Sequence, residues 1–219
     1  MLRAKFESKL NKLHMEIVEM GGCVQNAIKD SISAFKNNDL ELCKSIIEKD
    51  KIIDDKEKRI ESECLWMIAR EQPVASDLRA ITTALKITTD MERIGDHASD
   101  IAELTLRIDD KNTFSDSIQI LNMAKVAIEM LNNAVNAYVN CDLELAKRTE
   151  AMDDQADEYF NRIKEELVQI FNTQPQNMDS AIDLLLIAKY LERIADHAVN
   201  ICEWVWFSQT GEHKDTRIF

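Results

Sequence analysis

Two short stretches decide the fold: ERIGDHASDIAE at residues 92–103 and ERIADHAVNICE at residues 192–203. Eight of their twelve letters are identical, and the second copy begins one hundred residues after the first. Each copy is compatible with an α-helix and carries several acids. A repeat with this spacing predicts that the chain consists of two similar structural units in tandem.

Two further pairs of segments repeat at nearly the same spacing. NNDLELCKSIIEKDKIIDD at residues 37–55 matches VNCDLELAKRTEAMDDQADE at residues 139–158, with Asp-Leu-Glu-Leu aligned in both. The sequence EQP at residues 71–73 has a counterpart in NTQP at residues 172–175. The internal repeat is therefore supported at three separate places.

The composition indicates an all-helical protein. The 219 residues include only four glycines and two prolines, too few for the many turns that sheets require. Apolar residues recur every three or four positions between Phe6 and Phe35, which is typical of one long amphipathic helix. The next residues predict a break, with Asp39 capping a second helix from Leu40 to about Arg70.

A third helix is expected after Pro73, because proline is well tolerated in the first turn of a helix. We therefore predict an all-α fold of six helices in two tandem, similar antiparallel three-helix bundles, each burying its own apolar stripe. The first bundle is expected at residues 1–108 and the second at residues 114–219. The polar stretch RIDDKNTFSDS at residues 107–117 would join them.

Charge and cysteine content exclude several classes of protein. A net charge of −13 argues against direct nucleic-acid binding, which needs Lys and Arg to neutralise phosphates. The five cysteines are odd in number and form no Cys-x-x-Cys pair, as expected in a reducing cytoplasm. No stretch is typical of a signal peptide or a membrane span. We expect a cytoplasmic protein that meets membranes only peripherally, through partners.

Acidic residues of the repeated stretch share one face of the predicted helix. In the first copy they follow steps of four, four and three, which place on one face Glu92, Asp96, Asp100 and Glu103. The second copy places in the same arrangement Glu192, Asp196, Asn200 and Glu203. Exposed acidic faces of helices are common, so this pattern alone is also consistent with a solvated surface.

The preceding helix carries acids in the middle of a face that is otherwise apolar. Asp50 and Asp54 lie there in the first unit, and Asp153 and Asp157 take their places in the second. A short connection makes the two helices antiparallel neighbours, so each unit would bring two Asp/Glu-x-x-x-Asp pairs together. Such carboxylates repel one another strongly unless they are protonated or bridged by cations.

All-oxygen ligand sets favour Mg, Mn, Ca or iron over copper or a thiolate zinc centre. The spacing therefore predicts a metal site on each bundle. His97 and His197 each follow an aspartate by one residue, about 100° around the helix. We interpret both histidines as packing or supporting groups and leave them out of the ligand set.

The stretch EQPVASDLRAITTALKITTDMERIGDHASDIAE at residues 71–103, together with YLERIADHAVNICE at residues 190–203, resembles the PhoU family of phosphate-signalling regulators. The resemblance covers nearly the whole chain, including its length and its twofold repeat. It implies multinuclear clusters of iron or zinc, with Mg and Mn also considered. Carried over by position, the metal ligands are Asp50, Asp54, Glu92, Asp96, Asp153, Asp157, Glu192 and Asp196, with Asp100 as an extra ligand. Asn200 departs from the acidic pattern, so equal metal content of the two clusters does not follow.

The resemblance also implies a role. PhoU-like proteins restrain the phosphate-starvation response when phosphate is plentiful, by linking a phosphate ABC transporter, through its ATPase subunit, to a sensor histidine kinase. We accordingly expect a non-enzymatic negative regulator of phosphate uptake and signalling, and a homodimer. An acidic two-bundle protein is well suited to docking on basic surfaces of other proteins.

Two alternatives remain open at this point. The first is a helical adaptor whose acids are solvated and hold no functional metal. The second is a di-iron carboxylate oxidase of the ferritin-like type, whose bundles carry Glu-x-x-His pairs. Here Glu92 precedes His97 by five residues, and Glu192 precedes His197 by five, so the oxidase spacing is absent. No motif of a phosphate-binding loop, a serine hydrolase or a zinc protease is present either.

Overall fold

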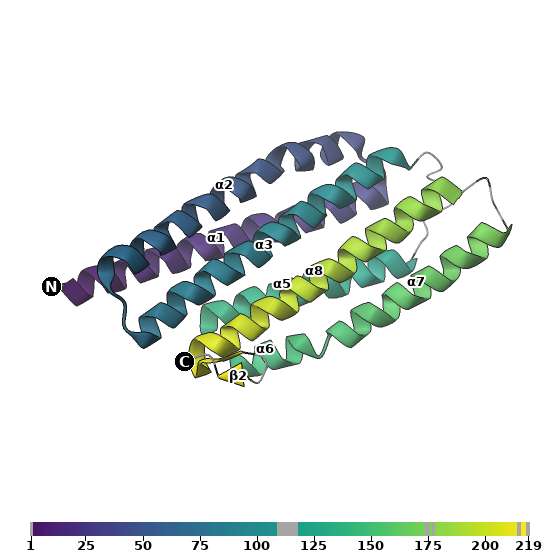
Figure 1. Ribbon diagram of the computed structural model, residues 1–219. Helices are drawn as coiled ribbons and strands as arrows, with labels where there is room; N and C mark the ends of the chain where they lie inside the picture. Colours follow the sequence, from purple (N-terminus) through teal and green to yellow (C-terminus); the bar gives the residue numbers. More distant parts are fainter. Residues whose placement is uncertain (1, 109–117, 174–175, 177, 214–215, 218–219) are drawn as a thin grey trace.

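The computed structural model describes residues 2–108, 118–173, 176, 178–213 and 216–217. The predicted boundary between the bundles, in the stretch 107–117, lies almost entirely outside the described residues, as does Pro175. Within them, long helices joined by short turns are followed by two short strands near the carboxyl end (Figure 1). The helices are α1 (Leu2–Asn37), α2 (Leu40–Glu71), α3 (Ala75–Arg107), α5 (Ile118–Asn140), α6 (Leu143–Glu150), α7 (Asp153–Thr173) and α8 (Met178–Thr210).

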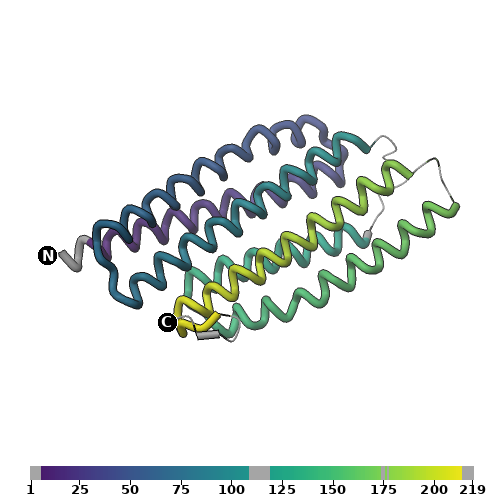
Figure 2. Tube along the Cα trace, viewed as in Figure 1, coloured from purple at the N-terminus to yellow at the C-terminus, as the bar shows by residue number. Residues whose placement is uncertain are grey.

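The helices form two antiparallel bundles, as the repeat predicts. Helices α1, α2 and α3 pack on one another, and α5, α6, α7 and α8 form the second group (Figure 1). The helices α3 and α8, which carry the two copies of the repeated stretch, lie side by side at the centre of the molecule (Figure 2). The predicted all-α fold with two similar halves is confirmed.

The hydrophobic core runs through both halves. Fully buried residues of α3 and α8 belong to one cluster that also contains residues of the other helices, and among them are Ile87, Met91, Ile94, Ile187, Leu191 and Ile194. Helix α1 also packs against α5. The prediction that each bundle buries its own stripe therefore holds only in part, because α3 and α8 share a large part of the core between the bundles.

The same tight turn ends the first helix of each half. Asn38 and Cys141 both adopt the left-handed conformation, with φ of 55° and 52°. The following residues, Asp39 and Asp142, cap the next helix by accepting hydrogen bonds from the backbone N–H groups three residues ahead, at 3.0 and 2.9 Å. This is the N-cap arrangement that aspartate favours. The predicted break after the first helix is confirmed.

Three local features differ from the simplest reading of the sequence. The helix of the second half that corresponds to α2 is divided into α6 and α7 by a turn at residues 151–152. Just before this turn, the Thr149 hydroxyl donates a hydrogen bond to the Leu145 carbonyl, an interaction that often accompanies bent helices. Pro73 lies two residues before α3, outside its first turn. At the carboxyl end, β1 (Glu212–His213) and β2 (Thr216–Arg217) form an antiparallel hairpin.

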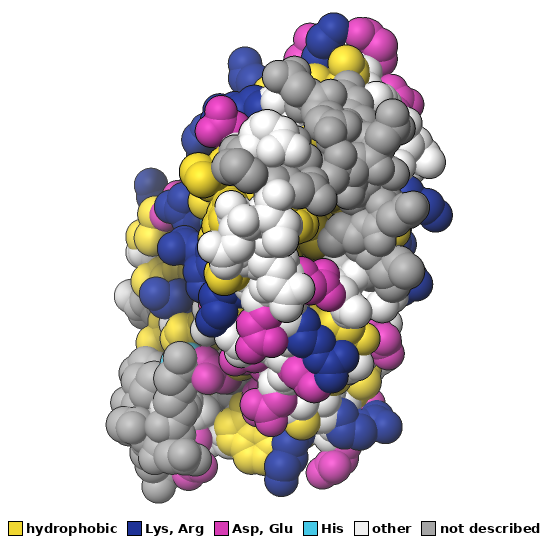
Figure 3. Space-filling model, turned by 90° about the vertical axis from the view of Figure 1, so that its right-hand side faces the viewer, with side chains coloured by type: hydrophobic (Ala, Val, Ile, Leu, Met, Phe, Trp, Pro, Cys, Tyr) yellow, Lys and Arg dark blue, Asp and Glu magenta, His cyan; other side chains and the backbone are white. Residues whose placement is uncertain are grey.

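The surface carries charges of both signs despite the net charge of −13. On the face shown in Figure 3, acidic and basic side chains are interspersed with apolar ones. None of the described helices combines the length and the apolar character that crossing a membrane would require.

Candidate metal centre

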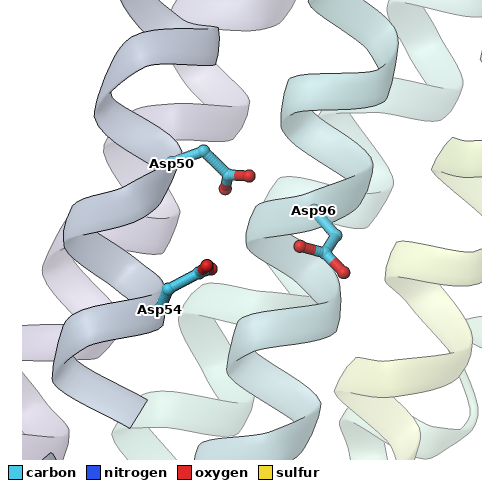
Figure 4. Close-up of side chains that lie close together, drawn as sticks. All are labelled: Asp50, Asp54 and Asp96. Carbon is cyan, nitrogen blue, oxygen red and sulfur yellow. The ribbon is translucent and has the colours of Figure 1, made fainter. Parts of the chain in front are cut away.

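Three aspartates converge between α2 and α3. Asp50 and Asp54 lie one turn apart on α2 and point toward α3, and Asp96 points toward them from α3 (Figure 4). One oxygen atom of each carboxylate lies within 4.8 Å of one oxygen atom of each of the other two. All three side chains are partly buried. We call these residues the aspartate trio.

The local sequence explains why the trio converges. Asp50 and Asp54 flank Ile53, which is 4% exposed, on the seam of α2 that packs against α3. Their four-residue spacing puts both carboxylates on the side of α2 that borders this seam. On α3, Asp96 lies between the buried Gly95 and His97. The trio thus sits at the edge of a packed helix pair, where its carboxylates are only partly hydrated.

The electrostatics of the trio disfavour three full negative charges. Burial, followed by the charges of Asp96 and Asp54, raises the pKa of Asp50 to about 6. Burial also raises the pKa of Asp96, with Arg93 opposing this effect. A bound cation would relieve both the repulsion and the loss of hydration. The arrangement is therefore suited to bind a cation.

Two glutamates extend the acidic face beside the trio. Burial, followed by the charges of Asp96 and Glu57, raises the pKa of Glu92 to about 7. The Glu92 Oε2 atom is buried and accepts no hydrogen bond from any described residue, although Arg93 Nε lies 3.4 Å away. A buried carboxylate oxygen that accepts no hydrogen bond is the kind of atom that a metal ion satisfies. Glu57 was not among the predicted ligands; its heptad spacing from Asp50 is the signal that points to it.

Asp100 faces another partner. Its Oδ2 atom lies 3.4 Å from the Nδ1 atom of His97, whose ring stacks on that of Tyr190 with centroids 5.2 Å apart. His197 of α8 contacts a carboxylate of the other helix, with its Nδ1 atom 2.8 Å from Oδ1 of Asp90 on α3. The two histidines therefore lie at the junction of α3 and α8, each against a carboxylate.

The second acidic group is arranged differently. Burial and the charges of Asp196 and Asp157 raise the pKa of Asp153 to about 6, so these acids also face one another. Asp157 and Asp196 are exposed, and Lys189 forms an ion pair with Glu192. Within the described ranges, no three of these four acids approach one another as closely as the trio does. The structure thus assembles the first group more tightly than the second.

The donor set determines which ions fit. The trio itself offers carboxylate oxygens, and Glu57 and Glu92 add further carboxylates on the same face. Such sets accept Mg, Mn, Ca or iron, and carboxylates also ligate zinc. The residues present therefore fit a hard cation held between two helices.

Comparisons with known proteins agree with this architecture. The family model of the PhoU domain matches residues 17–105 and again residues 120–205. The phosphate-specific transport system accessory protein PhoU homolog of Clostridium acetobutylicum is 38% identical over 216 residues, which are 98% of this chain and 99% of that protein.

Two crystal structures have nearly the same fold. The phosphate transport system regulatory protein PhoU of Streptococcus pneumoniae superposes with a TM-score of 0.90 at 28% identity, covering 96% of this chain and 100% of that one. PhoU of Pseudomonas aeruginosa gives a TM-score of 0.88 at 28% identity, with coverages of 94% and 100%. Since the PhoU domain model matches most of the sequence, once in each half, this chain belongs to the PhoU family.

Proposed function

We propose that this chain is a metal-binding regulator that restrains phosphate uptake and phosphate-starvation signalling when phosphate is plentiful. PhoU-family proteins are non-enzymatic regulators. The observation that carries the metal part of the proposal is the convergence of the aspartate trio, with a buried Glu92 oxygen nearby that accepts no hydrogen bond from the described residues.

The phosphate part of the proposal rests on the relatives. The Clostridium acetobutylicum protein is named an accessory protein of phosphate-specific transport, and the Streptococcus pneumoniae protein a regulatory protein of phosphate transport. For this chain we propose the same system, with docking in the cytoplasm on the ATPase subunit of a phosphate ABC transporter and on a sensor histidine kinase. A homodimer would present two such surfaces. Acidic faces on rigid helices suit contacts with basic protein surfaces.

The proposal assigns specific residues to each of two metal sites. Asp50, Asp54 and Asp96 hold one cation, with Glu92 and Asp100 as neighbouring acids that can extend the site to a cluster. The second site comprises Asp153, Asp157, Glu192 and Asp196. Iron and zinc are the proposed ions, with Mg and Mn as further candidates. A bound cation neutralises carboxylates that otherwise repel, and so fixes the separation of two helices on a docking face.

Metal analysis tests the first half of the proposal. Protein purified without chelator or nickel affinity should contain metal by mass spectrometry, and the double variant Asp50→Asn, Asp96→Asn should lose part of it. The matched control is Asp55→Asn, which removes an exposed carboxylate one residue beyond the trio. Equal metal in the parent and the double variant would exclude the trio as a site. No metal in any of them would leave a helical adaptor whose acids act by charge alone.

A reporter assay tests the regulatory half. In a bacterium lacking its own PhoU, the parent chain should repress a phosphate-starvation promoter at high phosphate, and Asp55→Asn should do so equally. The double variant should repress less if the metal takes part in regulation. Failure of the parent to repress, when produced at normal levels, would contradict the proposed role. Oxygen consumption by iron-loaded protein would instead favour the oxidase. An oxidase of this type uses histidines as metal ligands, whereas here both histidines contact carboxylates at the α3–α8 junction.

A further inference from the structure

Helices α2 and α3 approach each other closely beside the aspartate trio, at Gly95. A Cβ atom at this position would lie 2.9 Å from Cδ1 of Ile53, closer than such atoms pack, and 3.1 Å from its Cγ2, which is tighter than most Cβ contacts. It would also lie 3.6 Å from Oδ1 of Asp50, an ordinary contact distance. Gly95 thus lies against the residue between the two trio aspartates of α2, one residue before Asp96.

The second half of the molecule uses a different pair at this place. The repeat aligns Gly95 with Ala195, and it aligns Ile53 with Ala156, since Asp153 and Asp157 correspond to Asp50 and Asp54. Both alanines are fully buried. At this place the first half therefore has a glycine and a large isoleucine side chain, whereas the second half has two alanines. The aspartate trio forms only where the glycine and the isoleucine meet.

We propose that Gly95 and Ile53 are a positioning pair, which sets the separation of α2 and α3 and thereby makes the first carboxylate site the tighter of the two. The proposal rests on the metal-binding function proposed above, and deepens it. Neither residue contributes a ligand atom. Both act through the helix separation, which decides whether one cation can reach carboxylates of both helices.

Ile53 lines a cavity together with Gly95 and Asp50, but its own shape limits how far it can move away from a methyl group. It is 4% exposed and belongs to the core cluster. A β-branched side chain in a helix has one strongly preferred χ1 rotamer, so Cγ2 cannot turn away without strain. An alanine at position 95 would therefore push the two helices apart by some tenths of an ångström. Metal ligands tolerate errors of only about 0.2 Å, so the trio would lose cation affinity.

A titration with Mn²⁺, followed by electron paramagnetic resonance, tests the proposal. All proteins carry Asp153→Asn and Asp196→Asn, so that the first site alone is measured. Gly95→Ala should weaken Mn²⁺ binding by about 10- to 100-fold, the range found when groups that support metal ligands are changed. In the Ile53→Ala background the same change, which now gives the two alanines of the second half, should cost about threefold or less. The matched control is Gly22→Ala, because a Cβ there meets no atom within 4 Å.

Each outcome decides a separate point. If the parent binds Mn²⁺ and Gly95→Ala binds it equally, the positioning role is wrong while the metal site stands. A loss of the same size in both backgrounds, or with Gly22→Ala, would also overturn the pair. If the parent binds no Mn²⁺ and contains no metal as purified, the proposed metal function fails and this inference fails with it.

Thermal unfolding without metal provides a second readout. Gly95→Ala should lower the melting temperature in the Ile53 protein but not in the Ile53→Ala background, where helix propensity favours alanine. If Gly95→Ala fails to fold alone, recovery of folding by Ile53→Ala would support the contact, and continued failure would overturn it.

Discussion

The Nδ1 atom of His197 lies 2.8 Å from the Oδ1 atom of Asp90, and this contact joins α8 of the second half to α3 of the first. Asn200 donates a further hydrogen bond to the same oxygen, at 3.3 Å. The Asp90 side chain is only 13% exposed. One carboxylate thus satisfies two polar groups of the opposite helix, in the middle of the contact between the two halves.

Removing this carboxylate should destabilise the protein. Asp90→Ala would leave His197 and Asn200 without their acceptor, and should lower the free energy of unfolding by about 1–3 kcal/mol. Asp90→Asn keeps an acceptor oxygen and should cost less. Urea denaturation followed by circular dichroism gives both values, with the exposed Asp55→Ala as a control. Parent-like stability of Asp90→Ala would show that the contact contributes little.

The continuous core predicts that both halves unfold together. Ile94 is fully buried in α3 and belongs to the cluster that spans both halves. Ile94→Ala should therefore remove about 2–5 kcal/mol of stability from the whole molecule. Tryptophan fluorescence can follow each half, because Trp66 lies in α2 while Trp204 and Trp206 lie in α8. Variants that retain tryptophan in one half only should show the same shift in midpoint. A shift confined to the Trp66 reporter would mean that the halves unfold separately.

Much of this architecture could be predicted from sequence because the relevant signals are local. Asp39 and Asp142 indicate helix starts because aspartate side chains cap helix N-termini. The four-residue spacing of Asp50 and Asp54 places both on one helix face. Their convergence with Asp96 could be predicted because a short connection makes the two helices antiparallel neighbours.

Other features depend on packing between distant segments, which periodicity does not encode. The direct contact of α3 with α8 follows from how two apolar faces meet, so the pairing of Asp90 with His197 was not predicted. The tightness of the trio depends on Gly95 meeting Ile53, a contact between residues of two helices. The turn at residues 151–152 interrupts a segment whose sequence pattern is helical, and the Thr149 hydroxyl bonds to a backbone carbonyl just before it.

The helix caps at Asp39 and Asp142 should stabilise the protein by similar amounts, since both have the same geometry. Asp39→Ala and Asp142→Ala each remove the oxygen that accepts the N–H of Leu42 or Leu145. Each change should cost about 0.5–2 kcal/mol of unfolding free energy. The variants with Asn at these positions keep an acceptor and should remain close to the parent. A loss with Asn equal to that with Ala would show that charge, and not capping, is responsible.

The acidic faces should make the metal-free protein less stable as pH rises. Burial, with help from neighbouring carboxylates, raises the pKa of Asp50 and Asp153 to about 6 and that of Glu92 to about 7. In the unfolded chain these groups titrate near their usual values of about 4. Between about pH 4 and pH 7 the native state therefore binds more protons, and stability falls as pH rises through that window.

Glu92→Gln provides the test of this pH dependence. The acids that raise the pKa of Glu92 are Asp96, Glu57 and Asp54, and Arg93 opposes them. In the presence of chelator, the loss of melting temperature between about pH 5 and about pH 8 should be smaller in Glu92→Gln than in the parent. Glu48→Gln, at an exposed position of α2, should behave like the parent. An unchanged pH dependence in Glu92→Gln would contradict the assignment.

The cysteines should react with thiol reagents in an order set by burial. Cys141 is exposed in the turn between α5 and α6, and Cys23 is partly buried, while Cys43, Cys64 and Cys202 are buried. Burial also raises the pKa of the Cys64 and Cys202 thiols to about 12, so that neither is a thiolate at neutral pH. A chromogenic disulfide reagent should label Cys141 first and Cys23 more slowly. The three buried thiols should react only when the helices open, and Cys141→Ser should abolish the fast phase. Rapid labelling of Cys64 in the native protein, located by peptide mass spectrometry, would show that α2 leaves the core far more readily than its buried seam implies.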